Sequence, residues 1–125
     1  MGLACRKPLK ETGWVYTSIY GYFGATAAAG KLLGLNKEEM INAFGIAYSQ
    51  TAGNYQAIAD AVLTKRMQPG FAAKSGVLSA LLAKRGITGA QNSIEGQYGI
   101  YNVFLQGKYN AHALTEELGK SFEIA

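Results

Sequence analysis

The chain has 125 residues, a length that fits one domain with a buried core. Hydrophobic residues make up 49% of the chain and charged residues only 16%, which excludes a disordered chain and predicts a surface that is covered by a partner. The formal net charge is +4, but no run of basic residues is longer than two. We therefore expect no binding to nucleic acid.

The numbers of cysteines and histidines and the length of the apolar runs exclude further kinds of site and of protein. Cys5 is the single cysteine and cannot form a disulfide within the chain, and His112 is the single histidine, which excludes a metal site built from these two residue types. The first seven residues lack the apolar segment of a signal peptide. The apolar runs are shorter than the roughly 18 residues that span a bilayer. These features predict a cytoplasmic protein that does not bind a membrane.

Small residues characterise the first predicted helix, which runs from about Ser18 to Leu33. Leu32 and Leu33 are expected to complete its apolar face, and Gly34 stands where a left-handed C-terminal cap belongs. The small residues form a stripe that lets another helix approach closely: Gly21, Gly24, Ala25, Ala28 and Ala29.

A capping box marks the start of the second helix. Asn36 is followed three residues later by Glu39, and Leu35 with Met40 supplies a hydrophobic staple. This pattern predicts a helix over Lys37 to Ala52. Helical spacing turns one set of its residues inward: Met40, Ile41, Phe44, Ala47 and Tyr48.

A third helix is predicted from Pro69 to Arg85, after a less regular stretch, because proline suits a first helical turn and Gly86 suits a C-terminal cap. Its expected buried residues are Phe71, Val77, Leu78, Leu81 and Leu82.

The remaining chain is rich in turns. A short helix is expected from about Ile100, and another after Asn110 through Leu118 to Gly119. Residues 120–125 include Phe and Ile and predict the start of a strand that is not completed. The fold class is mainly α, a compact multi-helix unit over residues 1–125, and we expect it to be part of a larger domain.

Two cations form the most informative polar feature. Lys65 and Arg66 precede the helix that Pro69 starts, and free amide groups at a helix start attract carboxylates. The alternative is that they are ordinary solvated charges, and Lys74 also fits a surface position. A second polar set either lines a pocket or is half-buried at an interface: Trp14, Tyr16, Thr17, Tyr20 and Tyr22. The Gly24 to Lys31 segment has the wrong glycine spacing for a phosphate loop.

Several short blocks follow one another in a single register between about Gly13 and Glu123. They are Gly13-Trp14-x-x-Thr17, Gly21-x-Phe23-Gly24-Ala25, Leu32-Leu33-Gly34-Leu35, Ala43-Phe44-Gly45-Ile46-Ala47-x-Ser49-Gln50, Thr64-Lys65-Arg66-x-x-Pro69-Gly70-x-Ala72-Ala73-x-Ser75-Gly76, and Glu95-Gly96 near Tyr98-Gly99. Together these blocks resemble the MmgE/PrpD family. The resemblance implies a large helical domain, a smaller lid domain that this chain lacks, a homodimeric habit and no required cofactor or metal.

The resemblance also implies roles for individual residues. Lys65 matches the family lysine that contacts the substrate or assists proton transfer, so we expect it to be catalytic. Thr17, Arg66 and Gln68 are the expected substrate-binding residues. The family commonly has histidines at three positions that are occupied here by Val15, Gln68 and Lys74. Each of these substitutions removes a group that titrates near neutral pH.

Two functions follow as hypotheses. The first is the core helical part of a cofactor-free lyase or isomerase that acts on small di- or tricarboxylic acids, because removing a proton beside a carboxylate requires cations and a base. In this hypothesis Lys65 either moves the proton or anchors a carboxylate, and activity requires the segments that complete the domain. The second is a non-catalytic remnant or assembly subunit with a helical interaction surface. The expected partner is a second copy or a polypeptide that completes the domain.

Overall fold

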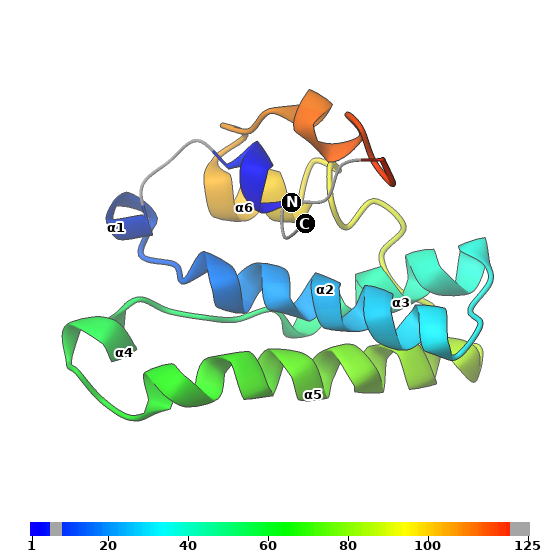
Figure 1. Cartoon of the computed structure of the whole chain (residues 1–125), viewed down its shortest axis with the longest axis horizontal. Coiled ribbons are helices and arrows are strands. Elements are labelled where there is room, and N and C mark those ends of the chain that lie inside the picture. The colour runs from blue at the N-terminus through cyan, green and yellow to red at the C-terminus, as the bar shows by residue number, and fades with distance from the viewer. Residues whose placement is uncertain (6–8, 121–125) are drawn as a thin grey trace.

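Three long helices dominate the computed structural model, which describes residues 1–5 and 9–120. They are α2 (Tyr16–Leu32), α3 (Lys37–Gln50) and α5 (Thr64–Lys84), and they lie side by side (Figure 1). The short elements are η1 (Gly2–Ala4), α1 (Leu9–Thr12), α4 (Gln56–Ala59), α6 (Ile100–Leu105) and η2 (Ala111–Leu114). Over the described ranges, β-pairing is limited to two isolated bridges, Cys5 with Tyr109 and Trp14 with Asn54. The prediction of a mainly α fold is confirmed.

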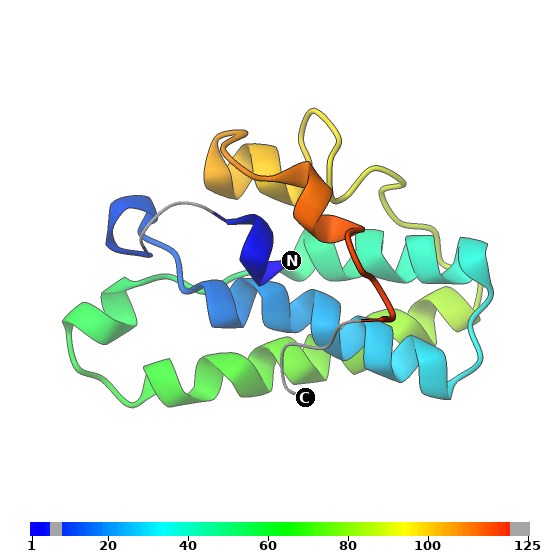
Figure 2. The same ribbon diagram turned by 45° about the horizontal axis from the view of Figure 1, so that its top comes forward.

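Helix α2 lies between α5 on one side and a layer of α6, η1 and η2 on the other (Figures 1 and 2). Its buried Ile19 and Phe23 contribute to a core that also takes residues from η1, α5 and α6. The core residues are Ala4, Ile19, Tyr22, Phe23, Ala72, Ile100, Tyr101 and Leu105.

The contact between α2 and α5 is made by small residues. A Cβ placed on Gly21 would lie 3.2 Å from the Cβ of Ala72, and one placed on Gly76 would lie 2.8 Å from the backbone nitrogen of Thr26 and also meet Ala25. The expectation that the stripe faces another helix is therefore confirmed for Gly21 and Ala25. Two other stripe members, Gly24 and Ala28, are exposed.

The predicted helix ends are also present. Glu39 N donates to Asn36 Oδ1 and Asn36 N donates to Glu39 Oε2, each at 2.9 Å, which completes the capping box. Gly34 has φ 65° after α2 and Gly86 has φ 85° after α5. In this left-handed conformation, glycine avoids the steric cost that a Cβ would bring.

The boundaries of the helices differ from the predicted ones. Helix α2 begins two residues earlier, at Tyr16, and α3 ends two residues earlier, at Gln50. Helix α5 begins at Thr64 instead of Pro69. Pro69 has no amide hydrogen to donate to the carbonyl of Lys65, but Gln68 beside it forms hydrogen bonds with α2 and with the segment before α4, and these hold the first turns of α5 in place.

The predicted inward face of α5 is wrong. Four of the five residues expected to be buried are between 42% and 48% exposed: Phe71, Val77, Leu78 and Leu81. The fifth, Leu82, is partly buried. The face that packs inward consists instead of small and polar residues: Gln68, Ala72, Ser75, Gly76, Ser79, Ala80 and Ala83. Small side chains permit the close approach to α2, and the larger ones are left outside. Leu32, predicted to close the apolar face of α2, is 89% exposed and Leu33 is exposed as well.

The last predicted helix is mostly absent. Only the short η2 forms after Asn110, and turns follow as far as residue 120. Glu117 and Gly119 have φ of 52° and 81°, which is incompatible with a right-handed helix. The predicted strand start over residues 120–125 lies outside the described residues, apart from Lys120, which is in a turn.

The aromatic residues near the start of α2 pack on one another and on α6. Trp14 meets Phe104 edge to face with 4.7 Å between ring centroids, and Tyr20 lies 5.7 Å from Tyr16 and 6.5 Å from Tyr101. Burial raises the pKa of Tyr20 and of Tyr101 above the ordinary value of a phenol. Tyr101 belongs to the core, and the other four aromatic residues are partly buried and pack against it.

The close contact of α2 with α5 can be tested with two glycines of the same helix. Gly76→Ala places a methyl group against Ala25 and the backbone of Thr26, so we expect a loss of about 1–3 kcal/mol in the free energy of unfolding. Gly70→Ala meets no atom within 4 Å and should gain about 0.5–1 kcal/mol through helix propensity. Urea unfolding followed by circular dichroism measures both. Equal effects of the two substitutions would contradict the packing described here.

The half-buried Tyr20 and the buried Tyr101 predict a loss of stability in alkali. Because folding raises the pKa of Tyr20 and Tyr101, the unfolded chain ionises first, and the stability that these phenols contribute is present below pH ~10 and is lost as pH rises above it. We expect Tyr20→Phe to reduce this loss between pH 9 and pH 11. The exposed Tyr98 provides the control, because Tyr98→Phe should leave the alkaline decline unchanged.

Candidate functional site

Lys65 and Arg66, on the first turn of α5, line a cavity of about 190 Å³. Its other walls come from α4 and the turn that follows, and are formed by Ala57, Ile58, Ala61 and Val62. Both cations are exposed at this position. The cavity thus combines an apolar wall with two positively charged donors, an arrangement suited to a small acid whose carboxylate meets the cations and whose carbon chain meets the wall.

The local charge is positive. No Asp or Glu occurs anywhere in α5, and its first turn carries the positive end of the helix dipole. The nearest carboxylate in sequence, Asp60 at the end of α4, accepts a hydrogen bond of 2.6 Å from Gln56 Nε2. An anion that approaches the start of α5 therefore meets two cations and helix amide groups.

Gln68 is 6% exposed and joins three segments. Its Oε1 accepts a hydrogen bond of 3.1 Å from Ser18 Oγ, and its Nε2 donates one of 3.0 Å to the carbonyl of Asn54. Both ends of the amide are thus engaged within the protein. The side chain also lines a second cavity of about 120 Å³ with Thr64 and Phe71. These two hydrogen bonds position Gln68 between α2 and the segment before α4, and the substrate contact expected from the sequence stays a prediction.

Thr17 is exposed on the first turn of α2. The chain just before this turn is fixed to the segment that precedes α4, because Val15 N donates to the Gly53 carbonyl and Tyr55 N donates to the Gly13 carbonyl, each at 2.8 Å. The hydrogen bond from α2 to α5 comes from Ser18, the neighbour of Thr17. The structure therefore holds the start of α2 against the start of α5, with Thr17 beside this junction.

Sequence analysis missed three residues that shape this region. Ser18 and Asn54 supply the two partners of Gln68, and Ala61 lines the Lys65 cavity with φ of 53°. No local pattern marks Ser18 or Asn54, because their partner is distant in sequence. Ala61 also carries no signal, since alanine is not a residue that favours positive φ.

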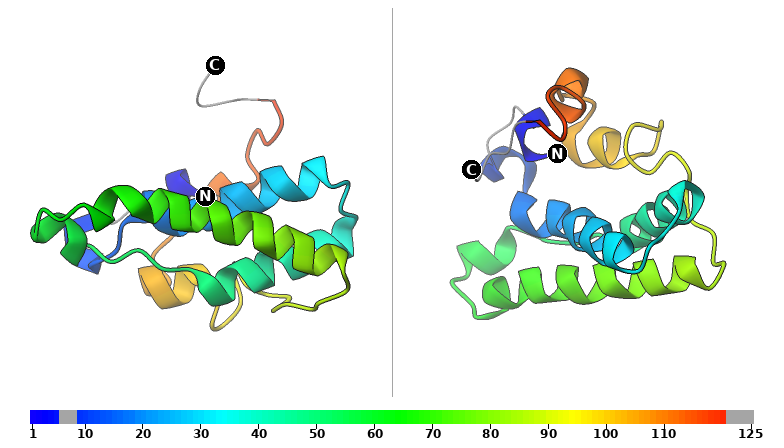
Figure 3. Two further views of the ribbon diagram at one scale, coloured as in Figure 1. Left: turned by 90° about the horizontal axis from the view of Figure 1, so that it is seen from below. Right: turned by 45° about the vertical axis from the view of Figure 1, so that its right-hand side comes forward.

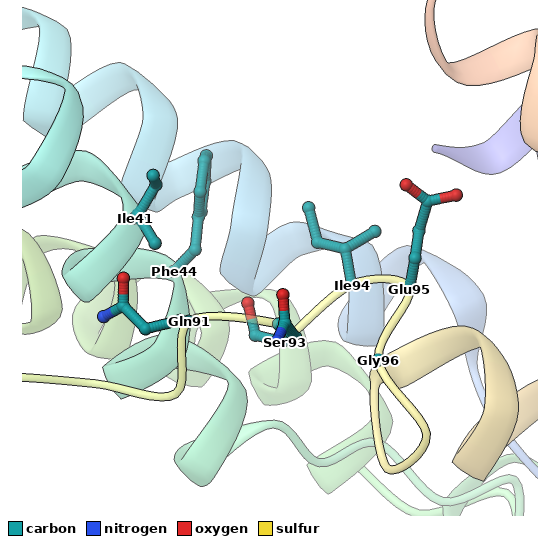
Figure 4. Close-up of a pocket in the computed structure, with 8 residues that line it drawn as sticks. Ile41, Phe44, Gln91, Ser93, Ile94, Glu95 and Gly96 are labelled. Carbon is teal, nitrogen blue, oxygen red and sulfur yellow. The ribbon is translucent and has the colours of Figure 1, made fainter.

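A different cavity, of about 290 Å³, lies between α3 and the loop before α6 (Figure 4). Its lining includes Ile41, Phe44, Gln91 and the single carboxylate of Glu95. Gln91 Nε2 is held by Asn42 Oδ1 at 2.7 Å. Since this lining offers a negative charge, it suits an acidic ligand less well than the start of α5 does.

The residues that the structure describes contain neither a side-chain cluster suited to a metal ion nor a helix that could cross a membrane. In those ranges, no three His, Cys, Asp or Glu side chains gather closely enough to hold a metal ion. His112 lies on η2, exposed and 3.7 Å from Glu116, away from α5. No helix within the described residues has both the length and the hydropathy needed to cross a membrane.

Comparison with known proteins gives consistent matches. Residues 2–112 match the family model of the MmgE/PrpD N-terminal domain. The cis-aconitate decarboxylase-like protein oryM of Aspergillus oryzae is 36% identical over 121 residues, which cover 92% of this chain and 25% of that protein. The cis-aconitate decarboxylase of Aspergillus terreus is 36% identical over 110 residues, which cover 87% of this chain and 22% of the relative. The chain thus spans about a quarter of the length of these relatives.

Ala61 lies in the wall of the Lys65 cavity with a left-handed backbone conformation, and this conformation can be tested by substitution. Ala61→Gly removes the Cβ that disfavours φ of 53°, so we expect the free energy of unfolding to rise by about 0.5–1 kcal/mol even though glycine makes the unfolded chain more flexible. The control is Ala59→Gly in α4, where φ is helical and glycine should destabilise by a similar amount. Thermal unfolding measures both, and a destabilised Ala61→Gly protein would contradict the left-handed turn.

Proposed function

Since the chain belongs to the MmgE/PrpD family, we propose that it forms the core helical part of a lyase or isomerase that acts on small di- or tricarboxylic acids. The observation that carries this proposal is the pairing of Lys65 and Arg66 in one cavity at the start of α5. Relatives described as cis-aconitate decarboxylases support the class of substrate. The reaction is a dehydration, decarboxylation or epimerisation next to a carboxylate.

The chemistry of such a reaction explains the need for cations. Removing a proton or carbon dioxide beside a carboxylate leaves negative charge on the substrate, and fixed positive groups stabilise that charge as it develops. Arg66 is permanently charged and suits two-point binding of a carboxylate. Lys65 carries a single mobile ammonium group, which either anchors a second oxygen or takes part in proton transfer.

The other residues of the region have supporting roles in this proposal. Gln68 holds the first turns of α5 against α2 through Ser18, and Thr17 offers a hydroxyl on the adjoining turn. Val15 cannot supply the titrating group that its histidine counterpart provides in the family, because its side chain is apolar and is buried at the N-cap of α2. Proton transfer then rests on Lys65 or on groups from segments that complete the domain.

A second function has an observation in its favour. The outward side of α5 exposes large apolar residues, as expected of a non-catalytic subunit that works through an interaction surface. The two functions separate in an assay of the purified chain with cis-aconitate and 2-methylcitrate, alone and mixed with the products of neighbouring genes. Turnover in either condition supports the lyase, and assembly without turnover supports the subunit.

Replacing Lys65 by methionine tests the site directly. Lys65→Met keeps most of the side-chain stem and removes the charge, so we expect the affinity for cis-aconitate or citrate, measured by titration calorimetry, to fall about ten- to a hundredfold. Folding stability should change little because Lys65 is exposed. Binding to the unmodified chain should also weaken as salt is added.

Lys74→Met is the matched control, since it removes the same charge from an exposed position of the same helix. Its affinity for the acid should stay within about twofold of that of the unmodified chain. Equal affinities for Lys65→Met and the unmodified chain, or no binding to either, would refute the proposed site in this chain.

A further inference from the structure

The outward side of α5 combines apolar and basic residues. Positions 67, 71, 74, 78 and 81 are three or four residues apart and so lie along one side of the helix. We name this set the α5 outer face; all its members are exposed: Met67, Phe71, Lys74, Leu78 and Leu81. Seen from the α5 side, none of the other described elements covers this helix (Figure 3). From Met67 to Leu81 the face is about 21 Å long at 1.5 Å per residue.

The charges around this face all have one sign. Arg66 lies before its first residue, Lys74 at its centre, and Arg85 after its last. Among the residues that the structure describes, no carboxylate forms an ion pair with any of these three, whereas the neighbouring Lys84 lies 3.9 Å from Glu39. Any molecule that covers the apolar residues therefore meets a cation at each end and one in the middle.

A second copy of α5 fits this pattern poorly. If two copies pack antiparallel about the centre, Lys74 meets its own counterpart and Arg66 approaches Arg85 of the other copy. A parallel pair brings each cation to itself. Since α5 contains no Asp or Glu, no register of α5 on α5 supplies a compensating charge, and like charges at an interface reduce affinity.

A membrane surface also fits poorly. Insertion of Phe71 and Leu78 into the acyl region would carry Lys74, which lies between them on the same side of the helix, away from water at a large cost. A protein partner can place a carboxylate opposite Lys74 while its apolar side chains cover the neighbouring residues. The charge pattern therefore favours a protein surface with acidic groups as the partner of the α5 outer face.

From these observations we infer that the α5 outer face binds an amphipathic helix whose apolar side carries acidic residues at its centre and at both ends. The apolar residues stand at i, i+4, i+11 and i+14, counted from Met67, and this spacing along one side matches the way one helix packs along another. Carboxylates opposite Arg66, Lys74 and Arg85 fix the register of the bound helix. Arg66 is shared with the proposed carboxylate site, whereas Lys74 and Arg85 do not line that cavity, so the test substitutes only these two cations.

The test uses the purified chain and three fluorescently labelled synthetic helical peptides. The first carries leucines on one side, with glutamates at its centre and both ends. The second has lysines in place of these glutamates, and the third has the composition of the first with leucines distributed around the helix. We expect fluorescence anisotropy to give at least about tenfold tighter binding of the first peptide than of the second in 50 mM salt. This ratio should shrink in 500 mM salt, and the third peptide should bind at least tenfold more weakly than the first.

Two variants of the chain complete the test. Lys74→Glu with Arg85→Glu should reverse the preference, so that the lysine peptide binds more tightly than the glutamate peptide. Phe71→Ser with Leu78→Ser should lose at least tenfold in affinity for the glutamate peptide. Circular dichroism checks that both proteins fold, and the charge-reversed variant keeps every apolar residue of the α5 outer face, so it remains informative if the serine variant unfolds.

Several results would overturn the inference. One is equal binding of the glutamate and lysine peptides, or a charge-reversed variant whose preference does not change. Another is a concentration-dependent dimer of the unmodified chain that light scattering no longer detects after the Phe71 and Leu78 substitutions, because that would make a second copy the occupant. A third is tighter binding to vesicles of phosphatidylserine and phosphatidylcholine than to the glutamate peptide.

Discussion

The close approach of α2 and α5 determines the arrangement of the whole molecule. Gly21 lies against Ala72, and Gly76 lies against Ala25 and the backbone of Thr26, so the two helices meet nearly backbone to backbone. Such a contact tolerates little rotation, because turning either helix would bring a larger side chain into the gap. The orientation of α5 about its own axis is therefore determined by small residues. This orientation in turn determines the direction in which each of its other side chains points.

Two functional features of α5 depend on this orientation. It turns Gln68 inward to Ser18 and Asn54, and it places Lys65, one turn earlier, against the residues of α4 that complete the cavity. The same orientation turns Phe71 and Leu78 outward. The proposed carboxylate site and the α5 outer face are thus two consequences of one packing contact, although the ligands proposed for them differ in kind and are tested separately.

Local signals were enough to predict part of this structure. The capping box of Asn36 and Glu39 and the left-handed Gly34 and Gly86 depend on residues close in sequence, and all are present. The inward face of α5 could not be predicted from hydrophobicity, since the large apolar residues are the exposed ones and the choice depends on contacts with Gly21 and Ala25 of a helix distant in sequence. The pairing of Lys65 with Arg66 was visible in the sequence, but the α4 wall of their cavity, with Ala61 at φ of 53°, was not.

Gln68 explains how the first turns of α5 and the start of α2 act as one unit. Pro69 removes a backbone hydrogen bond that would otherwise stabilise these turns, so their position depends more heavily on side-chain contacts. The two hydrogen bonds of Gln68 provide them and offset part of that loss. Because Ser18 adjoins Thr17, any movement of the Lys65 turn relative to the Thr17 turn must stretch the bond between Ser18 and Gln68. The spacing between the two turns that carry the candidate binding groups is therefore fixed by a buried amide, whereas Lys65 and Arg66 on the same turns of α5 are exposed.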